Sequence, residues 1–341
     1  MQNHFAKENE YIDCREKMAS KKVIKLINGV EIPKLGFGTW LAEPSVTGEG
    51  VKTALRLGYR HIDCASRYLN EPEIGEALTK TFNRNQDIKR SSVFLTGKLW
   101  SQDFHRVREA CEQSLKDLQV DYLDQYLVHH PVGIKPDCST FFPEKGEDLI
   151  PWEANKFQET WHEMEKLYKK GLVRSIGVCN FTKHKVSKLL ERLPEVRPHT
   201  VQNEIHPHLP QRNLIDYCRA EGISCTGFAS LGNRERPPQM IDAGDTVLLE
   251  DPTVGAIAQK NKVSNAQVLL AWGMQRDVSV LTRSVHEREI QDSFNAMELE
   301  LDSEDVEQIN GIKARCRYLK AKWYCLDGQS LDQVWDDEVL G

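Results

Sequence analysis

The chain has 341 residues, of which 40% are hydrophobic and 28% are charged, and its formal net charge is -6 at pH 7. These values are typical of a globular protein with a large apolar core. Lysine and arginine are mixed with acidic residues and form no basic stripe, so we expect no nucleic acid partner. No run approaches the roughly 20 apolar residues that span a membrane, so we expect no membrane partner.

The N-terminal residues and the cysteines indicate the compartment. Residues 1–22 are polar and contain no apolar run of signal-peptide length, which predicts a flexible extension on a cytoplasmic protein. The nine cysteines are an odd number and show no C-x-x-C spacing. They therefore favour reduced thiols over disulfides or a zinc site. With no H-E-x-x-H motif and no cluster of carboxylates, we expect no metal.

From residue 23 onward, short apolar β-prone runs alternate with longer segments of helical period. The predicted strands are residues 34–38, 60–63, 92–96, 122–128, 175–178, 199–203, 223–228 and 278–282. The helical period is clearest over residues 51–57, 107–118, 157–169, 183–193, 211–221 and 263–276. Such alternation is typical of a parallel sheet with crossover helices. Eight units predict an α/β fold, the (β/α)8 or TIM barrel, over residues 23–314.

Two glycine-containing segments bear on the architecture. An open doubly wound sheet is the alternative to a barrel, but the segment from Gly36 to Leu41 lacks the third glycine and the helix of a dinucleotide-binding loop. Before the first barrel strand, Asn28 and Gly29 predict a type I′ β-hairpin within residues 23–32. We expect this hairpin to cover the N-terminal end of the barrel.

Other local signals mark helix ends and the C-terminal tail. Ser264 is predicted to cap the start of a helix, and Gly171 and Gly222 are predicted to end helices. Residues 315–341 form a tail without clear periodicity, which we expect to cover the substrate site. Its aromatic residues are Tyr318, Trp323, Tyr324 and Trp335.

The polar residues near the ends of the predicted strands are candidates for catalysis, because barrel active sites form at the carboxyl ends of the strands. Asp63, Tyr68, Lys98 and His129 lie at three consecutive strand ends. A lysine ammonium stabilises a nearby phenolate, so we expect Lys98 to lower the pKa of Tyr68. Asp63 supplies a counter-charge that keeps Lys98 protonated. His129 adds a second donor to a carbonyl oxygen, and general-acid catalysis of this kind is worth roughly 10²–10⁴-fold in rate.

Each of these residues has an ordinary structural explanation when it is taken alone. A single aspartate after a strand is commonly a helix cap, a single tyrosine is commonly packing, and a single lysine commonly faces water. Only their convergence at one end of a barrel indicates chemistry. Cys64 is a weaker candidate for a nucleophile, because no paired base is in view.

Four separated motifs resemble those of the aldo-keto reductases, in the branch that contains aldose and aldehyde reductases. They are GYRHIDCA at 58–65, GKLW at 97–100, YLVH at 126–129 and IGVCNF at 176–181. The resemblance extends over about residues 24–312. It implies NADPH-dependent reduction of aldehydes and ketones, with aldoses among the candidate substrates. It also implies that Asp63, Tyr68, Lys98 and His129 form the catalytic tetrad, with Tyr68 as the general acid.

The same resemblance implies a cofactor site. Asn180 and Gln202 correspond to residues that bind the nicotinamide carboxamide, and Phe228 corresponds to the residue that stacks on the ring. Cys179 stands where relatives have serine, and Glu289 stands where they have a second arginine for the adenosine 2′-phosphate, so NADH is a candidate beside NADPH. The implied cofactor-binding residues are Thr39, Trp40, Asp63, Cys179, Asn180, Gln202, Phe228, Ala229, Leu231, Gly232, Glu235, Thr282, Arg283, Ser284, Val285, His286, Asp292 and Ser293.

The implied substrate is a small carbonyl compound bound by a monomer or weak dimer. The candidate substrate-binding residues are Trp40, Trp100, His129, His130 and Phe142. His130 stands where relatives have tryptophan or phenylalanine, which favours more polar substrates such as sugars. Because neighbouring residues of a regular strand face opposite ways, we expect only one of the two histidines to point at the substrate if the strand stays regular.

Two other functions compete with this interpretation. A non-catalytic barrel that binds NADPH and regulates a partner is disfavoured by the complete tetrad. A metal-dependent lyase or an aldolase is disfavoured by the absence of a metal motif and by the paired setting of Lys98. Steroid double-bond reductases of the same family carry glutamate in place of His129, so that reaction is also disfavoured.

Overall fold

A computed structural model describes residues 22–40, 46–84, 87–140, 142–328 and 330–340. The extension predicted for residues 1–22 lies outside the described residues, apart from Lys22. In the described parts of the chain, no helix is both long enough and apolar enough to cross a membrane.

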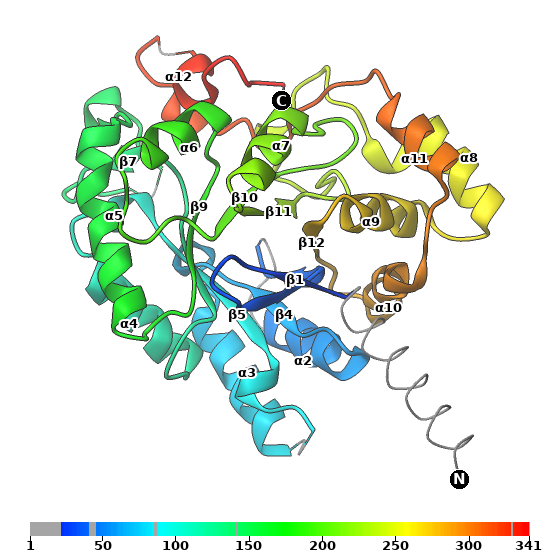
Figure 1. Ribbon diagram of the computed structural model, residues 1–341, viewed down its shortest axis with the longest axis horizontal. Coiled ribbons are helices and arrows are strands. Elements are labelled where there is room, and N and C mark those ends of the chain that lie inside the picture. The colour runs from blue at the N-terminus through cyan, green and yellow to red at the C-terminus, as the bar shows by residue number, and fades with distance from the viewer. Residues whose placement is uncertain (1–21, 41–45, 85–86, 141, 329, 341) are drawn as a thin grey trace, which may run out of the picture.

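Eight parallel strands form a closed barrel, in which each strand pairs with its neighbours along the chain and the last pairs with the first. Figure 1 shows the helices in a ring around these strands. The predicted TIM barrel is confirmed, and an open sheet is excluded because β12 pairs with β3. The strands are β3 (Leu35–Gly38), β4 (His61–Asp63), β5 (Phe94–Leu99), β6 (Gln125–Val128), β9 (Ile176–Cys179), β10 (Thr200–Glu204), β11 (Ser224–Phe228) and β12 (Val278–Thr282).

A helix of the outer ring follows each barrel strand. These helices are α2 (Thr47–Leu57), α3 (Glu71–Arg84), α4 (Val107–Leu118), α5 (Ala154–Lys169), α6 (Lys183–Leu190), α7 (Arg212–Ala220), α9 (Asn265–Gln275) and α10 (Glu287–Asn295). Two further helices, α8 (Pro252–Asn261) and α11 (Ser303–Asn310), pack against each other, and α12 (Asp332–Trp335) lies in the C-terminal tail. Figure 1 shows α11 beside α8.

Most predicted elements are present with shifted ends. The strand predicted over 92–96 is β5, which pairs with β6 up to Leu99, so Lys98 lies inside the strand instead of after it. The helix predicted over 183–193 ends at Leu190, and Leu193 adopts a φ of 51°. A proline follows Leu193, and the residue before a proline is disfavoured in the helical region.

The predicted helix caps are confirmed. The Ser264 hydroxyl accepts a hydrogen bond from the Gln267 backbone N–H at 3.1 Å, at the start of α9. Gly171 and Gly222 have φ values of 73° and 71°, in the left-handed region where glycine ends a helix without steric cost.

The N-terminal hairpin is present, but the predicted type I′ turn is wrong. Strands β1 (Val23–Lys25) and β2 (Glu31–Pro33) pair antiparallel. The Gly29 N–H donates to the Leu26 carbonyl at 2.8 Å, and Gly29 has a positive φ of 86° while Asn28 does not. The loop is therefore one residue longer than predicted, because it includes Ile27 as well as Asn28 and Gly29. It forms a type I turn in which the glycine adopts the left-handed region.

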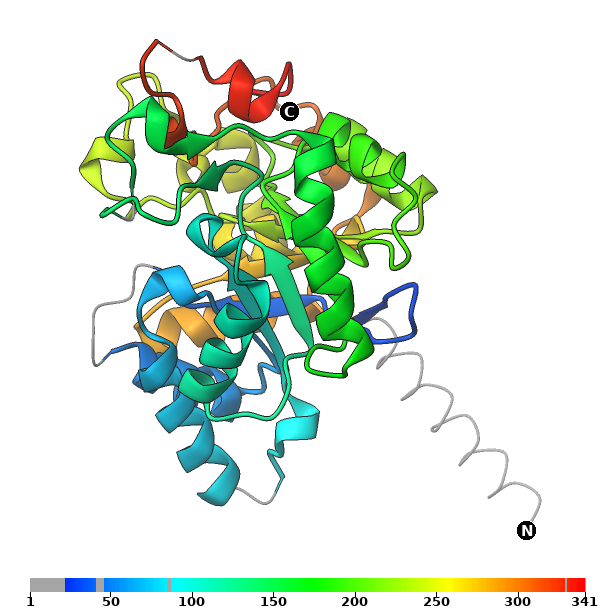
Figure 2. The ribbon, with the colours of Figure 1, turned by 90° about the vertical axis from the view of Figure 1, so that its left-hand side faces the viewer.

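The hairpin covers the N-terminal end of the barrel, as predicted. Leu26 and Ile32 are buried against Phe94 at the start of β5. Figure 1 shows β1 near the centre of the view, inside the ring of helices. In Figure 2 the hairpin lies at the right-hand side, and the loops after β6 and β11 lie on the opposite side.

Polar side chains fill the barrel interior below the site. The His61 ring lies 3.0 Å from the Thr96 hydroxyl, and the Gln125 amide donates to the Thr200 hydroxyl at 2.8 Å. All four side chains are buried. Because each has a partner inside the barrel, this layer forms a floor under the carboxyl ends of the strands.

The C-terminal tail packs over the carboxyl end of the barrel. Tyr324 and Trp335 are buried against Trp100 and against a short hairpin of β7 (Gly133–Ile134) and β8 (Leu149–Ile150). The Lys185 ammonium on α6 lies 2.8 Å from the Asp336 carboxylate of the tail. Both apolar packing and a nearly buried ion pair therefore hold the tail beside the mouth of the barrel.

Candidate active site

Lys98 connects two other predicted catalytic residues, Asp63 and Tyr68. Its side chain is fully buried, and its ammonium donates to the Asp63 carboxylate, to the Cys64 carbonyl at 3.1 Å and to the Tyr68 hydroxyl at 3.1 Å. Asp63 ends β4, Lys98 lies on the neighbouring strand β5, and Tyr68 ends the short helix η1 (Ser66–Tyr68). The second carboxylate oxygen of Asp63 accepts from the Gln202 amide at 2.8 Å.

Burial and charge act in opposite directions on these groups. Burial lowers the pKa of Lys98, but Asp63 and Tyr68 outweigh it and hold the pKa above its ordinary value. Burial raises the pKa of Tyr68 above its usual range, although the Lys98 charge and hydrogen bond oppose this. We expected Lys98 to lower the Tyr68 pKa, and this expectation is wrong. The hydration free energy that a phenolate loses on burial in this site exceeds the electrostatic stabilisation that Lys98 provides. Tyr68 is protonated at neutral pH.

His129 and His130 follow β6, and both line the same cavity. Their rings stack at 5.3 Å, and the Tyr68 ring lies 5.7 Å from the His129 ring. The expectation that only one histidine faces the substrate assumed a regular strand, and this condition is not met, because β6 ends at Val128 and strict alternation ends with it. The pKa of His129 lies well below its usual value, mainly because the ring is buried, and burial lowers the pKa of His130 to about 3. Both imidazoles are therefore neutral.

Asn180 and Gln202 lie beside the catalytic candidates. Asn180 has a φ of 63°, and its amide donates to the His129 carbonyl at 2.8 Å, while its amide oxygen is buried without a hydrogen-bond partner. Cys179 lies next to it, with its sulfur 3.7 Å from the Gln202 amide oxygen. Burial raises the pKa of the Cys179 thiol to about 12. The thiol of Cys64 is also buried and its pKa lies well above its usual value, which disfavours Cys64 as a nucleophile.

A cavity of about 790 Å³ joins these residues to the rest of the predicted site. All the predicted substrate-binding residues line it, and so do all the predicted cofactor-binding residues except Gly232. Gly232 has a φ of 85° and lies against Leu248, behind the wall. Trp323 of the tail lines the cavity. Tyr324 lies behind the cavity wall, where its hydroxyl is 2.9 Å from the Ser101 hydroxyl and forms a hydrogen bond with it.

The far end of the cavity contains a mixed set of charges. Arg283 lies 3.5 Å from the Glu235 carboxylate of the loop after β11. The Ser284 hydroxyl donates to the Glu289 carboxylate at 2.6 Å, and Glu289 itself lines the cavity. This end therefore presents both positive and negative charges.

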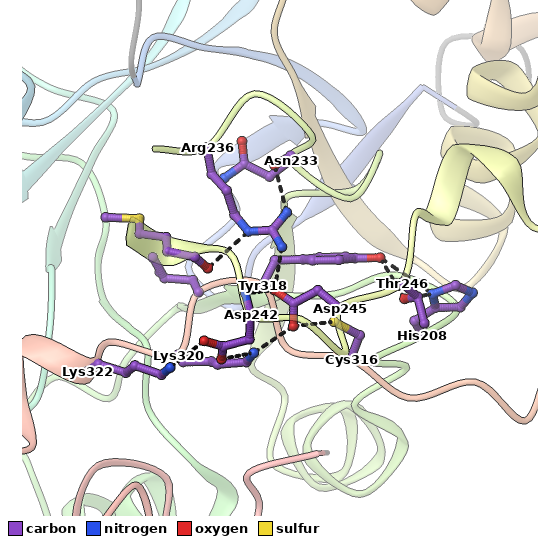
Figure 3. A network of polar contacts seen from close by, with 12 residues as sticks. His208, Asn233, Arg236, Asp242, Asp245, Thr246, Cys316, Tyr318, Lys320 and Lys322 are labelled. Atoms are coloured by element: carbon purple, nitrogen blue, oxygen red, sulfur yellow. Dashed lines mark hydrogen bonds and ion pairs between the residues drawn. The ribbon is translucent and has the colours of Figure 1, made fainter. Parts of the chain in front are cut away.

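A network of polar contacts joins the loop after β11 to the C-terminal tail (Figure 3). This loop–tail network consists of Arg236, Asp242 and Asp245 from the loop and of Tyr318, Lys320 and Lys322 from the tail. Asp245 accepts from Arg236 at 2.5 Å and from Lys320 at 2.6 Å, and the Arg236 guanidinium lies 4.8 Å from the Tyr318 ring centre. Burial raises the pKa of Asp245, but these hydrogen bonds outweigh it and bring the pKa to about 2. The pairs are thus ionised at neutral pH.

Several cavity residues were absent from the sequence-based prediction. They are Gly38, Arg67, Arg234, Met240, Leu249, Ala266, Leu281 and Leu319. For Arg67 a signal existed, since it directly precedes the predicted acid Tyr68. For Leu319 and Met240 no local signal existed, because distant loops bring them to the cavity. In the described parts of the chain, no group of three histidine, cysteine, aspartate or glutamate side chains is placed to hold a metal ion.

Comparison with known proteins decides the family. A sequence model described as the aldo/keto reductase family matches residues 34–314. The chain belongs to this family. An aldo/keto reductase of Synechocystis sp. is 38% identical over 322 residues, which cover 93% of this chain and 97% of that protein. Human aldo-keto reductase family 1 member A1 is 38% identical over 304 residues, which cover 89% of this chain and 92% of that protein.

A solved structure supports the same assignment. The aldose reductase of Schistosoma japonicum aligns with a TM-score of 0.79 and 38% identity, covering 89% of this chain and 95% of that chain. The resemblance inferred from the four motifs is confirmed. The chain is an aldo-keto reductase, an oxidoreductase of carbonyl compounds that depends on NAD(P)H.

Proposed function

We propose that this aldo-keto reductase uses NADPH to reduce aldehydes and ketones to alcohols, with Tyr68 as the general acid. The observation that carries the proposal is the chain of contacts from Asp63 through Lys98 to the Tyr68 hydroxyl, at the wall of a cavity that His129 also lines. A phenol and a neutral imidazole in one wall, with a buried ammonium bound to the phenol oxygen, are suited to proton donation to a carbonyl oxygen.

The residues at the barrel mouth fit a nicotinamide cofactor. The buried amide oxygen of Asn180 has no partner and is suited to accept from a carboxamide N–H, and Gln202 and Phe228 line the same part of the cavity. Arg283, Ser284 and His286 line the far end, where a phosphate is suited. When bound, the dihydronicotinamide supplies a hydride to the carbonyl carbon.

Tyr68 and His129 would hold the carbonyl oxygen between two neutral donors. Because the Tyr68 phenol is protonated, its hydroxyl is able to give its proton to the oxygen as negative charge develops there. Lys98, held by Asp63 and by the Cys64 carbonyl, places positive charge 3.1 Å from the phenol oxygen and stabilises it once the proton has left. This is stabilisation of developing charge by groups already in position.

The substrate end of the cavity supports small polar carbonyl compounds. Trp40, Trp100 and Phe142 supply apolar walls, and His130 adds a neutral imidazole in the same wall. Aldoses are therefore among the proposed substrates. The cytoplasmic location, the monomeric or weakly dimeric state and the division into residues 1–22, 23–314 and 315–341 stay predictions from the sequence.

The proposal is tested by following NADPH oxidation with a panel of aromatic aldehydes, aldoses and ketones, with NADH in parallel. We expect turnover with aldehydes, and we expect the rate to saturate with both the aldehyde and NADPH. Binding of NADPH is measured separately, by quenching of tryptophan fluorescence. Tight binding without turnover of any carbonyl compound would contradict the proposal and support the regulatory barrel instead.

Cys179→Ser is expected to tighten NADPH binding about 2- to 10-fold. A serine hydroxyl in the cavity wall makes a stronger hydrogen bond to a carboxamide than a thiol does, and one such bond is worth about 0.5–1.5 kcal/mol. The Kd is measured by fluorescence titration, with Cys218→Ser, whose thiol is buried away from the cavity, as the control. Because the Cys179 thiol is buried and protonated, we also expect dilute peroxide to leave the wild-type Kd unchanged.

Asp245→Asn is expected to make NADPH dissociate roughly 10-fold faster. The substitution leaves Arg236 and Lys320 without their shared carboxylate, and removing one partner of a buried ion pair costs about 3–5 kcal/mol. Part of that free energy destabilises the closed position of the loop, whose Asn233, Arg234 and Glu235 line the cavity. The rate is measured by stopped-flow displacement of NADPH.

The control for Asp245→Asn is Asp277→Asn, which removes an exposed pair with Lys34 3.0 Å away, outside the cavity lining. We expect no change in the dissociation rate for this variant, because exposed pairs contribute little. If both variants release NADPH at the wild-type rate, the loop–tail network does not hold the loop over the cofactor.

A further inference from the structure

The carboxylate of Glu204 has no part in the proposed proton transfer and lies where the C-terminal tail meets the barrel. Glu204 ends β10, and its side chain is fully buried. Its Oε1 atom accepts from the Tyr318 backbone N–H at 2.6 Å, and its Oε2 atom accepts from the Leu319 backbone N–H at 2.7 Å. A ring nitrogen of His206 lies 2.9 Å from Oε1. One side chain of the barrel therefore holds two successive backbone groups of the tail.

These two hydrogen bonds take the place of secondary structure in the tail. Residues 312–320 belong to the described part of the chain and form neither helix nor strand there. Tyr318 is buried, and a buried backbone N–H without an acceptor costs free energy comparable to a lost hydrogen bond. Because an ionised carboxylate is a stronger acceptor than a neutral oxygen, the bonds to Glu204 fix the path of the tail firmly.

Glu204 is ionised in this setting. Burial raises the pKa of its carboxyl, but hydrogen bonds from His206 and Tyr318 and the charge of Arg317 outweigh burial and hold the pKa below its ordinary value. The Arg317 guanidinium is itself buried and donates to the Val339 carbonyl at 2.7 Å. The tail thus supplies a counter-charge to the carboxylate that holds it.

The position of Leu319 follows most directly from these bonds. Leu319 lines the cavity, and so does Trp323 four residues later. The next residue, Lys320, is held from the other side, because its ammonium lies 2.6 Å from the Asp245 carboxylate of the loop after β11. The Trp323 ring lies 5.2 Å from the Phe142 ring at the substrate end. Leu319 therefore lies between one anchor on the barrel and another on the loop.

We propose that Glu204 is a positioning residue for the substrate. It acts through the backbone of residues 318 and 319 and holds Leu319 and Trp323 in place as the tail wall of the substrate end. Among aldehydes that fit the cavity, those with an apolar group long enough to reach this tail wall are bound more tightly than short ones. The inference rests on the proposed function, because Tyr68 and His129 place the carbonyl end.

The test compares a short aldehyde, propanal, with a long one, 4-isopropylbenzaldehyde. Glu204→Gln replaces one acceptor oxygen by an NH2 group that faces a backbone N–H, so we expect the tail wall to loosen. The ratio of kcat/KM for the long aldehyde to that for propanal is expected to fall about 10-fold, which corresponds to the loss of about two buried methylene groups. We expect the fall to come mainly from a higher KM and kcat for propanal to stay near its wild-type value.

Glu165→Gln is the matched control. Glu165 on α5 is also buried, accepts from the Val196 backbone N–H at 2.8 Å and lies 3.0 Å from a ring nitrogen of His162, but it is outside the cavity lining. We expect this variant to keep the wild-type ratio, because a ratio of two substrates on one variant cancels a general loss of folded enzyme. Glu204→Asp, which keeps the charge on a shorter side chain, is expected to give an intermediate ratio.

A second variant tests whether Glu204 acts through the tail wall. Leu319→Ala shortens a partly exposed side chain, so we expect it to fold and to lower the same ratio. When it is combined with Glu204→Gln, we expect little further fall, because the two substitutions remove the same contact with the substrate. Fully additive losses would mean that Glu204 affects the substrate by another route, and would overturn the proposal.

Hydrogen exchange followed by mass spectrometry tests the anchor without any substitution, and decides the matter if Glu204→Gln does not fold. In the wild-type enzyme we expect the amides of Tyr318 and Leu319 to exchange about 100-fold or more slowly than in an unstructured peptide. In Glu204→Gln we expect this protection to fall while that of α9 stays. Rapid exchange of both amides in the wild-type enzyme overturns the proposal.

The remaining outcomes separate this proposal from the proposed function. A ratio that Glu204→Gln leaves unchanged contradicts the role of Glu204 while carbonyl reduction stands. Equal loss of kcat on both aldehydes also contradicts it, because the effect would then lie on Gln202 and the catalytic groups. Absence of turnover on both aldehydes in the wild-type enzyme contradicts the proposed function, and the role of Glu204 in substrate selection with it.

Discussion

Tyr68→Phe is expected to lower kcat for aldehyde reduction about 10²- to 10⁴-fold, while NADPH binds with nearly unchanged affinity. The substitution removes the proton donor and leaves the ring that packs 5.7 Å from His129. Lys98 and Asp63 remain paired, so the buried charge keeps its partner. Single-turnover measurement of NADPH oxidation separates the chemical step from cofactor release, and a Kd from fluorescence quenching checks binding.

The control is Tyr217→Phe, which removes a hydroxyl from α7 outside the cavity lining. We expect wild-type kcat for this variant. If Tyr68→Phe reduces aldehydes at the wild-type rate, another group gives the proton and the proposed mechanism is wrong. If it loses NADPH binding as well, Tyr68 is required for the shape of the site and the experiment is repeated with Lys98→Met, which keeps the phenol.

Glu289→Arg is expected to raise the preference for NADPH over NADH roughly 10- to 100-fold. Glu289 lines the far end of the cavity and accepts a hydrogen bond from Ser284 at 2.6 Å. A carboxylate there repels an adenosine 2′-phosphate and is suited to accept from a ribose 2′-hydroxyl, as acidic residues do in NAD sites. An arginine replaces this repulsion by a charge-assisted pair, worth about 1.5–3 kcal/mol.

The measurement is the ratio of kcat/KM for NADPH to that for NADH at constant ionic strength. Glu287→Arg is the matched control, because it makes the same charge change on α10 outside the cavity lining. A ratio that moves equally in the two variants would mean that net charge, and not contact with the phosphate, sets the preference. An unchanged ratio in Glu289→Arg would place the 2′-phosphate away from this residue.

The alternation of strand and helix was sufficient to predict the barrel, because each βα unit carries its own apolar pattern and caps. Ser264, Gly171 and Gly222 cap helices that lie within a few residues of them, so their roles could be predicted from the neighbouring sequence. The order of Asp63, Tyr68, Lys98 and His129 along successive strands was also readable. Parallel strands of a barrel bring their carboxyl ends to one side, so a linear list of strand ends becomes a spatial cluster.

Other properties depended on contacts between distant residues. The raised pKa of Tyr68 follows from burial that outweighs the effect of Lys98, and the shared position of His129 and His130 in the cavity wall follows from where β6 ends. The turn at Gly29 depended on one additional loop residue.

By itself, the sequence determined the fold class, the family and the chemical types present at the barrel mouth, because these follow from local patterns repeated along the chain. Only the tertiary structure decided which charges meet. Asp245 binds Lys320, which lies 75 residues away in the sequence, and Arg67 contacts the ring of Phe142, which lies in a separate loop. Such pairings depend on loop paths, and no short-range pattern encodes the path of a loop.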